Sequence, residues 1–205
     1  MAGINPEQFQ QLLGQLFAAI TNHEPTVLAK INALLEKIPE DPNLLHLAGL
    51  ASADQNQLSA AIDYFLRSLS RQPEQPEVHN NLANVYAKQG NDLLAEKHYR
   101  QALQLNPDFQ DALKNLGLLL ISVSPEVAVV ELDRAIAQNS KDIGALTGLG
   151  DAYKALENFE LSTEYYQRAL EINPNHVTAR HNLALCYKLN EQLALATANY
   201  KIALG

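Results

Sequence analysis

Proline or serine recurs at an almost constant interval along this chain of 205 residues. The positions are Pro39, Pro73, Pro107, Ser140 and Pro174, which gives intervals of 34, 34, 33 and 34 residues. A period of this length is typical of a helical solenoid, in which one helical hairpin recurs and each copy buries its apolar face on the next. The period therefore fixes the expected architecture and favours a binding or scaffold protein over an enzyme.

Other residue types follow the same period. When each unit is counted so that the proline is position 32, the third unit begins at Pro76. Large residues then stand at positions 7, 11 and 24 and small ones at positions 8, 20 and 27; in the third unit they are Leu82, Tyr86, Tyr99, Ala83, Ala95 and Ala102. Small residues allow two antiparallel helices to approach closely, and large ones fill the remaining space. The fifth and sixth units repeat the pattern, and the fourth loses one residue in its central turn.

Helix-breaking residues separate the apolar segments. Gly90-Asn91 interrupts the third unit, and Asn106-Pro107 ends it, because proline disfavours helix in the residue before it. Applied to every unit, the pattern predicts twelve helices of roughly 12–16 residues and no strand.

The repeated positions resemble the tetratricopeptide repeat (TPR) of bacterial proteins, whose pattern is a Leu-Gly pair followed by Tyr, Ala, an aromatic residue, Ala and Pro. The resemblance implies an all-α fold, a right-handed α–α superhelical solenoid that occupies residues 1–205 as a single domain. Its repeats are expected at about 8–41, 42–75, 76–109, 110–142, 143–176 and 177–205. The first keeps only the apolar spacing and Pro39, so we interpret it as a degenerate copy. The tryptophan that the family places at position 4 is absent.

The charge of the chain argues against a nucleic-acid or membrane surface. The formal net charge is −8 and the isoelectric point is about 5.2, and the basic residues form no run. No apolar stretch approaches the ~20 residues needed to span a bilayer. The first basic residue is Lys30, so the start lacks the charged region of a secretory signal. We therefore expect a cytoplasmic protein whose partners are neither nucleic acids nor membranes.

No arrangement of residues indicates catalysis or metal binding. The six histidines are spread over five units, and the closest pair, His176 and His181, lies across an expected helix boundary. No Ser-His-Asp set, P-loop or dinucleotide-binding glycine run is present. The single cysteine, Cys186, lies within an expected helix, where a buried, inert thiol is the usual state. We expect neither enzymatic activity nor a cofactor.

The resemblance implies that the first helix of each unit lines a concave groove, which would hold an extended peptide segment of a partner protein. The residues expected to contact it are Asn81, Asn84, Lys88, Lys114, Asn115, Asp151, Lys154, Asn182 and Lys188. Position 6 carries Asn81, Asn115 and Asn182, and a side-chain amide can pair with both ends of a peptide unit. This arrangement is similar to the asparagine ladder of O-linked N-acetylglucosamine transferases, although Leu47 and Gly148 interrupt it. An alternative is that asparagine is simply a solvated polar residue there.

The carboxylate clamp of chaperone-binding TPR proteins is incomplete in this chain. Asn84 and Asn115 match its two asparagines, but Asn80, Gly144 and Gly148 replace its cationic residues. The four lysines of the expected groove would favour an acidic or C-terminal peptide. Acidic residues on the same face offset them, so a mixed, solvated surface is the alternative.

Two other functions stay open. Asn-Leu-Ala and Asn-Leu-Gly runs, at residues 81–83, 115–117 and 182–184, are also similar to the repeats that precede bacterial glycosyltransferases and sulfotransferases. The chain would then be the targeting arm of a larger enzyme. The last unit carries Leu193, Leu195 and Ile202 with little charge, which predicts either a fragment of a longer protein or a scaffold that forms a homo-oligomer through this end.

Overall fold

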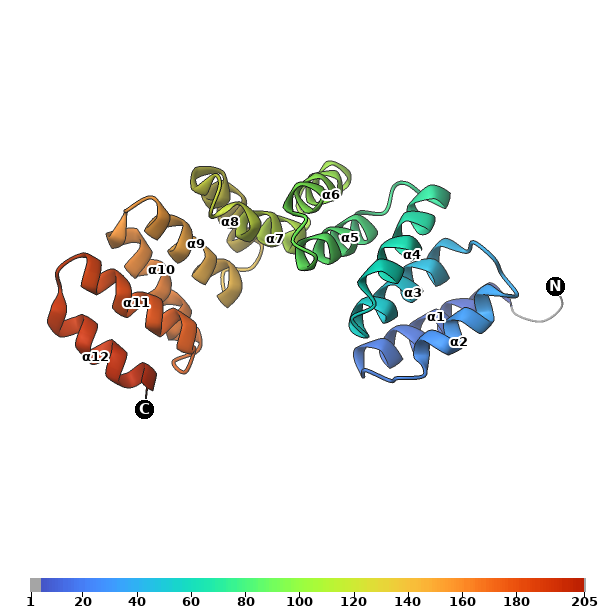
Figure 1. The fold of residues 1–205 in the computed structure, drawn as a ribbon, viewed down its shortest axis with the longest axis horizontal. Coiled ribbons are helices and arrows are strands. Elements are labelled where there is room, and N and C mark those ends of the chain that lie inside the picture. Colours follow the sequence, from blue (N-terminus) through green and yellow to red (C-terminus); the bar gives the residue numbers. More distant parts are fainter. Residues whose placement is uncertain (1–4, 205) are drawn as a thin grey trace. The chain divides into compact units, whose positions relative to one another are not determined.

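The structure is a computed structural model that describes residues 5–204 and the side chains of residues 5–202. The described residues form helices and no strand (Figure 1). The helices are α1 (Pro6–Thr21), α2 (Val27–Leu35), α3 (Pro42–Asp54), α4 (Leu58–Arg71), α5 (Pro76–Lys88), α6 (Asp92–Leu105), α7 (Gln110–Leu120), α8 (Pro125–Gln138), α9 (Ile143–Ala155), α10 (Phe159–Ile172), α11 (Val177–Leu189) and α12 (Leu193–Leu204). The all-α fold and its twelve helices are confirmed within this part of the chain.

Two helices are shorter than the sequence predicts. α2 has 9 residues and α7 has 11, against an expected minimum of 12. α7 belongs to the fourth unit, which lacks one residue, and α2 to the degenerate first unit. In both units a local departure from the repeat pattern shortens the helix.

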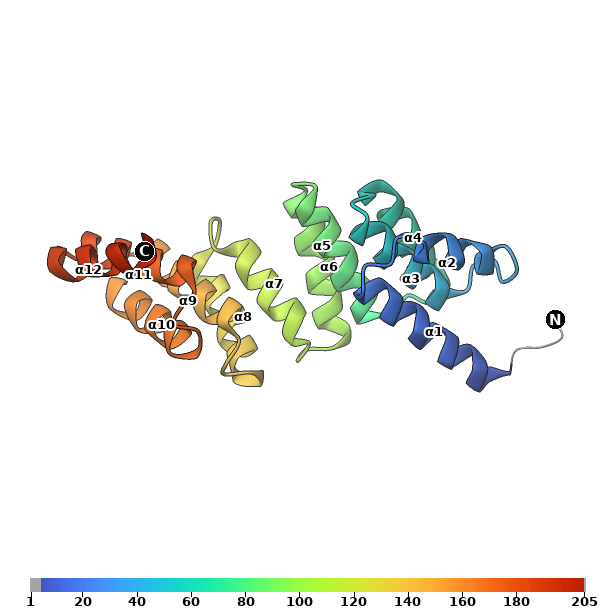
Figure 2. The ribbon, with the colours of Figure 1, turned by 90° about the horizontal axis from the view of Figure 1, so that it is seen from below.

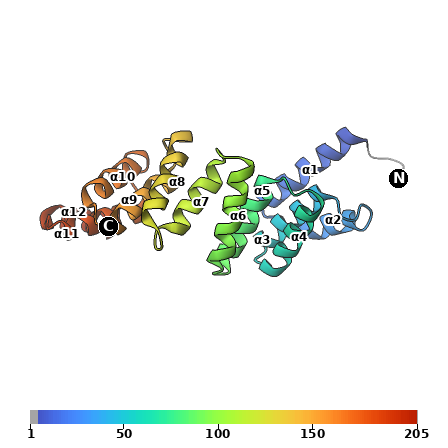
Figure 3. The same ribbon diagram turned by 90° about the horizontal axis from the view of Figure 1, so that it is seen from above.

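The chain divides into two compact units, each of which contains several repeats: an N-terminal unit, Met1–Asn106, with α1–α6, and a C-terminal unit, Pro107–Gly205, with α7–α12. From α3 onward the helices pair as hairpins. The pairs are α3 with α4 and α5 with α6 in the N-terminal unit, and α7 with α8, α9 with α10 and α11 with α12 in the C-terminal unit (Figures 2 and 3). Within each unit, the second helix of a hairpin also packs against the first helix of the next. This is the nearest-neighbour packing of a helical repeat.

In three hairpins a glycine at position 8 packs against the large residue at position 24. Tyr166 of α10 is fully buried, and a Cβ atom added to Gly150 of α9 would lie 2.5 Å from its ring. The Oγ atom of Ser162, also fully buried, donates a hydrogen bond of 2.7 Å to the carbonyl of Gly150. Gly117 faces Leu132 in the same way in the preceding hairpin. The small residues of the repeat therefore allow the close helix contact that the sequence predicts.

The turn inside most hairpins contains one residue with left-handed backbone geometry at position 15. These residues are Asn56, Gly90, Glu157 and Glu191, with φ angles of 59°, 76°, 58° and 58°. Only glycine adopts this geometry without a steric cost, so Glu157 and Glu191 are held there by the hairpin. The shortened turn of the fourth unit contains no such residue.

Candidate peptide-binding surface

The nine residues predicted to bind a peptide all lie on the first helices of hairpins. Asn81, Asn84 and Lys88 are on α5 of the N-terminal compact unit. The other six are on α7, α9 and α11 of the C-terminal compact unit: Lys114, Asn115, Asp151, Lys154, Asn182 and Lys188. The structure shows which of these side chains already have partners within their own unit.

Asn81 contacts the preceding hairpin. Its Nδ2 atom lies 2.9 Å from Nε2 of His46 on α3. Burial, partly offset by the charge of Glu77, lowers the pKa of His46 below its usual value. The imidazole is therefore neutral, and Nε2 accepts a hydrogen bond from the amide. This bond uses one N–H of Asn81 and does not involve its carbonyl oxygen.

In two hairpins the residue at position 9 is hydrogen-bonded to the residue at position 24. The hydroxyl of Tyr99 donates a hydrogen bond of 2.6 Å to Oδ1 of Asn84, and the hydroxyl of Tyr166 donates one of the same length to Oδ1 of Asp151. Where position 24 is apolar, position 9 is leucine: the pairs are Phe65 with Leu50 and Leu132 with Leu118. The sixth unit departs from this relation, because Leu185 stands at position 9 although position 24 is Tyr200. Position 9 is thus partly determined by the interior of its own hairpin.

Asp151 is the centre of a cluster that joins three helices. Its Oδ1 atom accepts hydrogen bonds from the Tyr166 hydroxyl at 2.6 Å, from Nζ of Lys154 at 2.7 Å and from Nδ2 of Asn182 at 3.0 Å. Burial, the bond to Asp151 and its charge raise the pKa of Tyr166 far above the usual value. Three of the predicted residues therefore lie together, and they connect α9 with α10 and α11.

Lys114 connects α7 to the start of α9. Its Nζ atom lies 3.2 Å from Oδ2 of Asp142, the residue whose other oxygen caps α9 through the amide of Ala145. Burial lowers the pKa of Lys114, but ion pairs with Asp142 and Asp111 outweigh it and raise the pKa above its usual value. Only 23% of the Lys114 side chain is exposed. The lysine thus has a clear structural role that the sequence did not reveal.

Lys88 and Lys188 differ from the other two predicted lysines. Both are exposed, and neither forms an ion pair with the part of the chain that the structure describes. Lys154, by contrast, pairs with Asp151 and lies 5.8 Å from the centre of the Tyr166 ring.

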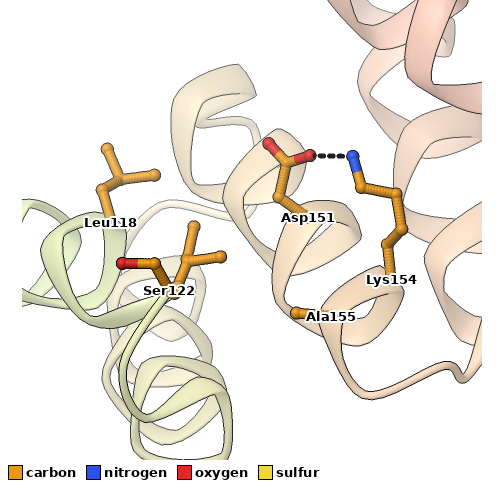
Figure 4. Close-up of a pocket in the computed structure, with 6 residues that line it drawn as sticks. Leu118, Ser122, Asp151, Lys154 and Ala155 are labelled. Atoms are coloured by element: carbon orange, nitrogen blue, oxygen red, sulfur yellow. Dashed lines mark hydrogen bonds and ion pairs between the residues drawn. The ribbon is translucent and has the colours of Figure 1, made fainter.

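A hollow of about 510 Å³ lies between α7 and α9 in the C-terminal compact unit. Its walls are Leu118, Ile121 and Ser122 on one side and Asp151, Lys154 and Ala155 on the other (Figure 4). Of the predicted residues, Asp151 and Lys154 line it, whereas Leu118, Ile121, Ser122 and Ala155 are not among the predicted residues. Within the described residues, no three His, Cys, Asp or Glu side chains gather as a metal site. None of the described helices is both long and apolar enough to cross a membrane.

Three family models match the chain. One described as tetratricopeptide repeat matches residues 76–109 and 144–176, a second with the same description matches residues 165–198, and one described as TPR repeat matches residues 49–90. Together these matches cover more than half of the chain. The chain belongs to the tetratricopeptide repeat family. TPR proteins are generally non-catalytic scaffolds, and the chain is accordingly a protein–protein interaction module. Residues 110–143, which include the shortened fourth unit, lie outside the matches.

Curated relatives share parts of this TPR chain. The protein O-mannosyl-transferase Tmtc3 of Drosophila melanogaster is 28% identical over 63% of the chain and 14% of its own length. A DnaJ homolog subfamily C member 7 homolog of Schizosaccharomyces pombe is 30% identical over 57% of the chain and 26% of its own length. The TPR repeat-containing protein MJ0940 of Methanocaldococcus jannaschii is 33% identical over 51% of the chain and 33% of its own length. The chain thus spans a third or less of each of these relatives.

Solved structures of TPR proteins share the fold. A TPR protein from Parabacteroides merdae superposes with a TM-score of 0.77 and 22% identity, covering 94% of this chain and 77% of the other. MamA gives 0.71 and 23% identity, covering 76% and 92%. YrrB, described as a TPR protein with an unusual peptide-binding site, gives 0.72 and 20% identity, covering 85% and 90%. At these identities, the likeness shows the fold alone.

Proposed function

We propose that this TPR protein binds an extended peptide segment of a partner protein on the first helices of its hairpins. The observation that carries the proposal is the hollow between α7 and α9, where apolar Leu118 and Ile121 lie opposite polar Asp151 and Lys154. Ligand sites combine a mostly apolar wall with a few fixed polar groups, and this hollow has that composition. The description of YrrB as a peptide-binding TPR protein is consistent with the proposal.

Recognition on this surface requires several contacts at once. Each hydrogen bond from an asparagine or lysine side chain contributes about 0.5–1.5 kcal/mol. We therefore expect a dissociation constant on the order of micromolar, which corresponds to about −8 kcal/mol.

A peptide array followed by titration tests the proposal. The groove variant replaces both Asn182 and Lys188 of α11 by alanine, and the control variant replaces Asn175 and Lys141, which lie on exposed turns of the same unit. Array peptides should bind the native chain and the control equally, and the groove variant at least tenfold more weakly. An array without binders, or binders that do not distinguish the two variants, would refute the proposal.

A second candidate is that these repeats are the targeting arm of a larger enzyme. The matching segment of the Drosophila relative makes up 14% of a protein O-mannosyl-transferase, so TPR segments of this kind do occur beside catalytic domains. The genomic reading frame around this chain tests the idea: a neighbouring transferase domain in the same frame would support it, and stop codons at both ends would exclude it.

A further inference from the structure

The hollow between α7 and α9 has a polar wall of unusual composition. Asp151 and Lys154 lie one helical turn apart on α9, and their side chains meet at 2.7 Å (Figure 4). The pair has no net charge, yet it presents an anionic acceptor and a cationic donor next to each other. What such a pair would recognise depends on which of its atoms are already used.

The two oxygens of Asp151 differ in this respect. Oδ1 accepts three hydrogen bonds, from Tyr166, Lys154 and Asn182, and so has no capacity left for a ligand. Oδ2 accepts none from the described residues, and Figure 4 shows this oxygen on the side away from Lys154, toward Leu118 and Ser122. Because a lysine ammonium has three N–H groups, Lys154 keeps two after donating to Asp151. The hollow thus contains one carboxylate acceptor and one ammonium donor that can serve a ligand.

The opposite wall is mostly apolar. Leu118 is 40% exposed although it is a large hydrophobic residue, and Ile121 extends the same surface beside Ser122, while Ala155 adds a small apolar group on the α9 side. A volume of about 510 Å³ falls within the range of ligand pockets, so an aliphatic side chain and its flanking backbone fit inside.

Gly148 makes room for this wall. A Cβ atom at Gly148 would lie 2.6 Å from Cδ2 of Leu118, so only glycine leaves Leu118 in its present position against α9. Gly148 is also the position at which the row of asparagines is interrupted. The interruption removes an amide from the groove, and Asp151 with Lys154 supplies an acceptor and a donor one turn further along the same helix.

We infer that the hollow binds one uncharged aliphatic residue of an extended peptide. The main-chain N–H of this residue donates to Oδ2 of Asp151, a neighbouring main-chain carbonyl accepts from Lys154, and the side chain lies on Leu118 and Ile121. A ligand cation would compete with Lys154 for Asp151, and a ligand anion would face the Asp151 carboxylate, so neither charge is favoured. This inference rests on the proposed function. It specifies which class of peptide side chain the hollow of the C-terminal compact unit selects.

Capped single amino acids test the inference without knowledge of the natural partner. The probe is N-acetyl-leucine-N-methylamide, which carries one side chain with the flanking N–H and C=O groups of an extended chain. A probe of this size is expected to bind with a Kd on the order of 1 mM. Titration into ¹⁵N-labelled protein should shift the amide resonances of Ile121, Ser122, Asp151 and Ala155. The arginine and glutamate analogues should bind at least fivefold more weakly.

Two variants show that the hollow itself is responsible. Ala155→Leu fills the hollow from an exposed helix position and should weaken the leucine probe at least fivefold, whereas the control Ala137→Leu, at an exposed position of α8, should leave binding unchanged. Lys154→Met keeps the length of the side chain but removes the donor, and should also weaken binding of the leucine probe. The glutamate analogue should still bind this variant more weakly than the leucine probe does.

The outcomes separate this inference from the proposed function. If the leucine probe causes no shift at these residues, or if a charged probe binds as tightly, the inference is wrong. If array peptides nevertheless bind the native chain and lose affinity in the Asn182/Lys188 variant, the groove function stands without it. If neither array peptides nor probes bind, both proposals fail.

Discussion

The hydrogen bond between Tyr166 and Asp151 allows a direct test of how position 9 is determined. Tyr166 is fully buried, and its hydroxyl donates to a carboxylate at 2.6 Å. Hydrogen bonds to charged groups contribute about 1.5–3 kcal/mol, but the Asp151 side chain is 31% exposed and keeps two other donors. We therefore expect Tyr166→Phe to lower the free energy of unfolding by about 1–2 kcal/mol. The neutral pair of Tyr99 and Asn84 gives the matched comparison, with about 0.5–1.5 kcal/mol expected for Tyr99→Phe.

A double-mutant cycle isolates the pair. Asp151→Leu leaves the buried Tyr166 hydroxyl without its acceptor, which adds a penalty of about 1–3 kcal/mol to the loss of the other two bonds. The double variant, with Phe at position 24 and Leu at position 9, has the combination that Phe65 and Leu50 form naturally in the α3–α4 hairpin. Its loss of stability should therefore be about 1–2 kcal/mol smaller than the sum of the two single losses.

Urea unfolding followed by circular dichroism, fitted with a nearest-neighbour model for repeats, provides the four free energies. Additivity within about 0.5 kcal/mol would show that the two side chains are independent. In that case, the matching of positions 9 and 24 across the hairpins has no energetic basis, and the reasoning that links them is wrong.

Three further predictions concern other parts of the chain. Glu157→Gly should raise the free energy of unfolding by up to about 1 kcal/mol because φ is 58° there, whereas Glu164→Gly, at an exposed site within α10, should lower it by a similar amount; urea titration compares the two. Burial and the neighbouring His79 lower the pKa of His98 from 6.5 to about 4, so the unfolded chain binds a proton more readily than the folded one. The free energy of unfolding should therefore fall by up to about 3 kcal/mol as the pH is lowered from 6.5 to 4, and His98→Phe should reduce this fall. Leu193 and Ile202 of α12 are 65% and 61% exposed, which favours self-association through this helix. Multi-angle light scattering should then show an oligomer, and replacing both residues by glutamate should convert it to a monomer. A native monomer at all concentrations would contradict the expected homo-oligomer.

The fold could be predicted because each element depends on local sequence. The glycine at position 15, Gly90, has the left-handed geometry that a helix-breaking residue indicates, and the small residue at position 8, Gly150, contacts the large residue at position 24. These relations recur in neighbouring units, so an error in one unit does not obscure the pattern. The exceptions are α2 and α7, whose lengths depend on units that depart from the repeat.

The candidate surface was harder to predict because its side chains pair across hairpins. The repeat places Lys114 on a first helix, but the sequence does not show that its ammonium reaches the capping residue Asp142, 28 positions later. In the same way, the bond from Asn81 to His46 spans 35 residues and depends on how two hairpins stack. The sequence contains a partial signal: position 9 changes from Leu to a polar residue in the third and fifth units, where position 24 is Tyr, but the sixth unit keeps Leu185 opposite Tyr200.

Exposure and position on a first helix are therefore not enough to identify a binding residue in this protein. Lys188 and Lys114 occupy the same face by repeat position, yet the first extends into solvent and the second stabilises a helix start. Asp151 belongs to both categories, because one of its oxygens holds α10 and α11 while the other points into the hollow. A ligand that binds the free oxygen would contact the same carboxylate that orders three helices. Since a group that binds only the folded state stabilises it, occupation of the hollow and stability of the α9–α11 hairpins are thermodynamically linked. For this reason, substitutions at Asp151 cannot separate binding from folding, whereas changes at Ala155 and Lys188 can.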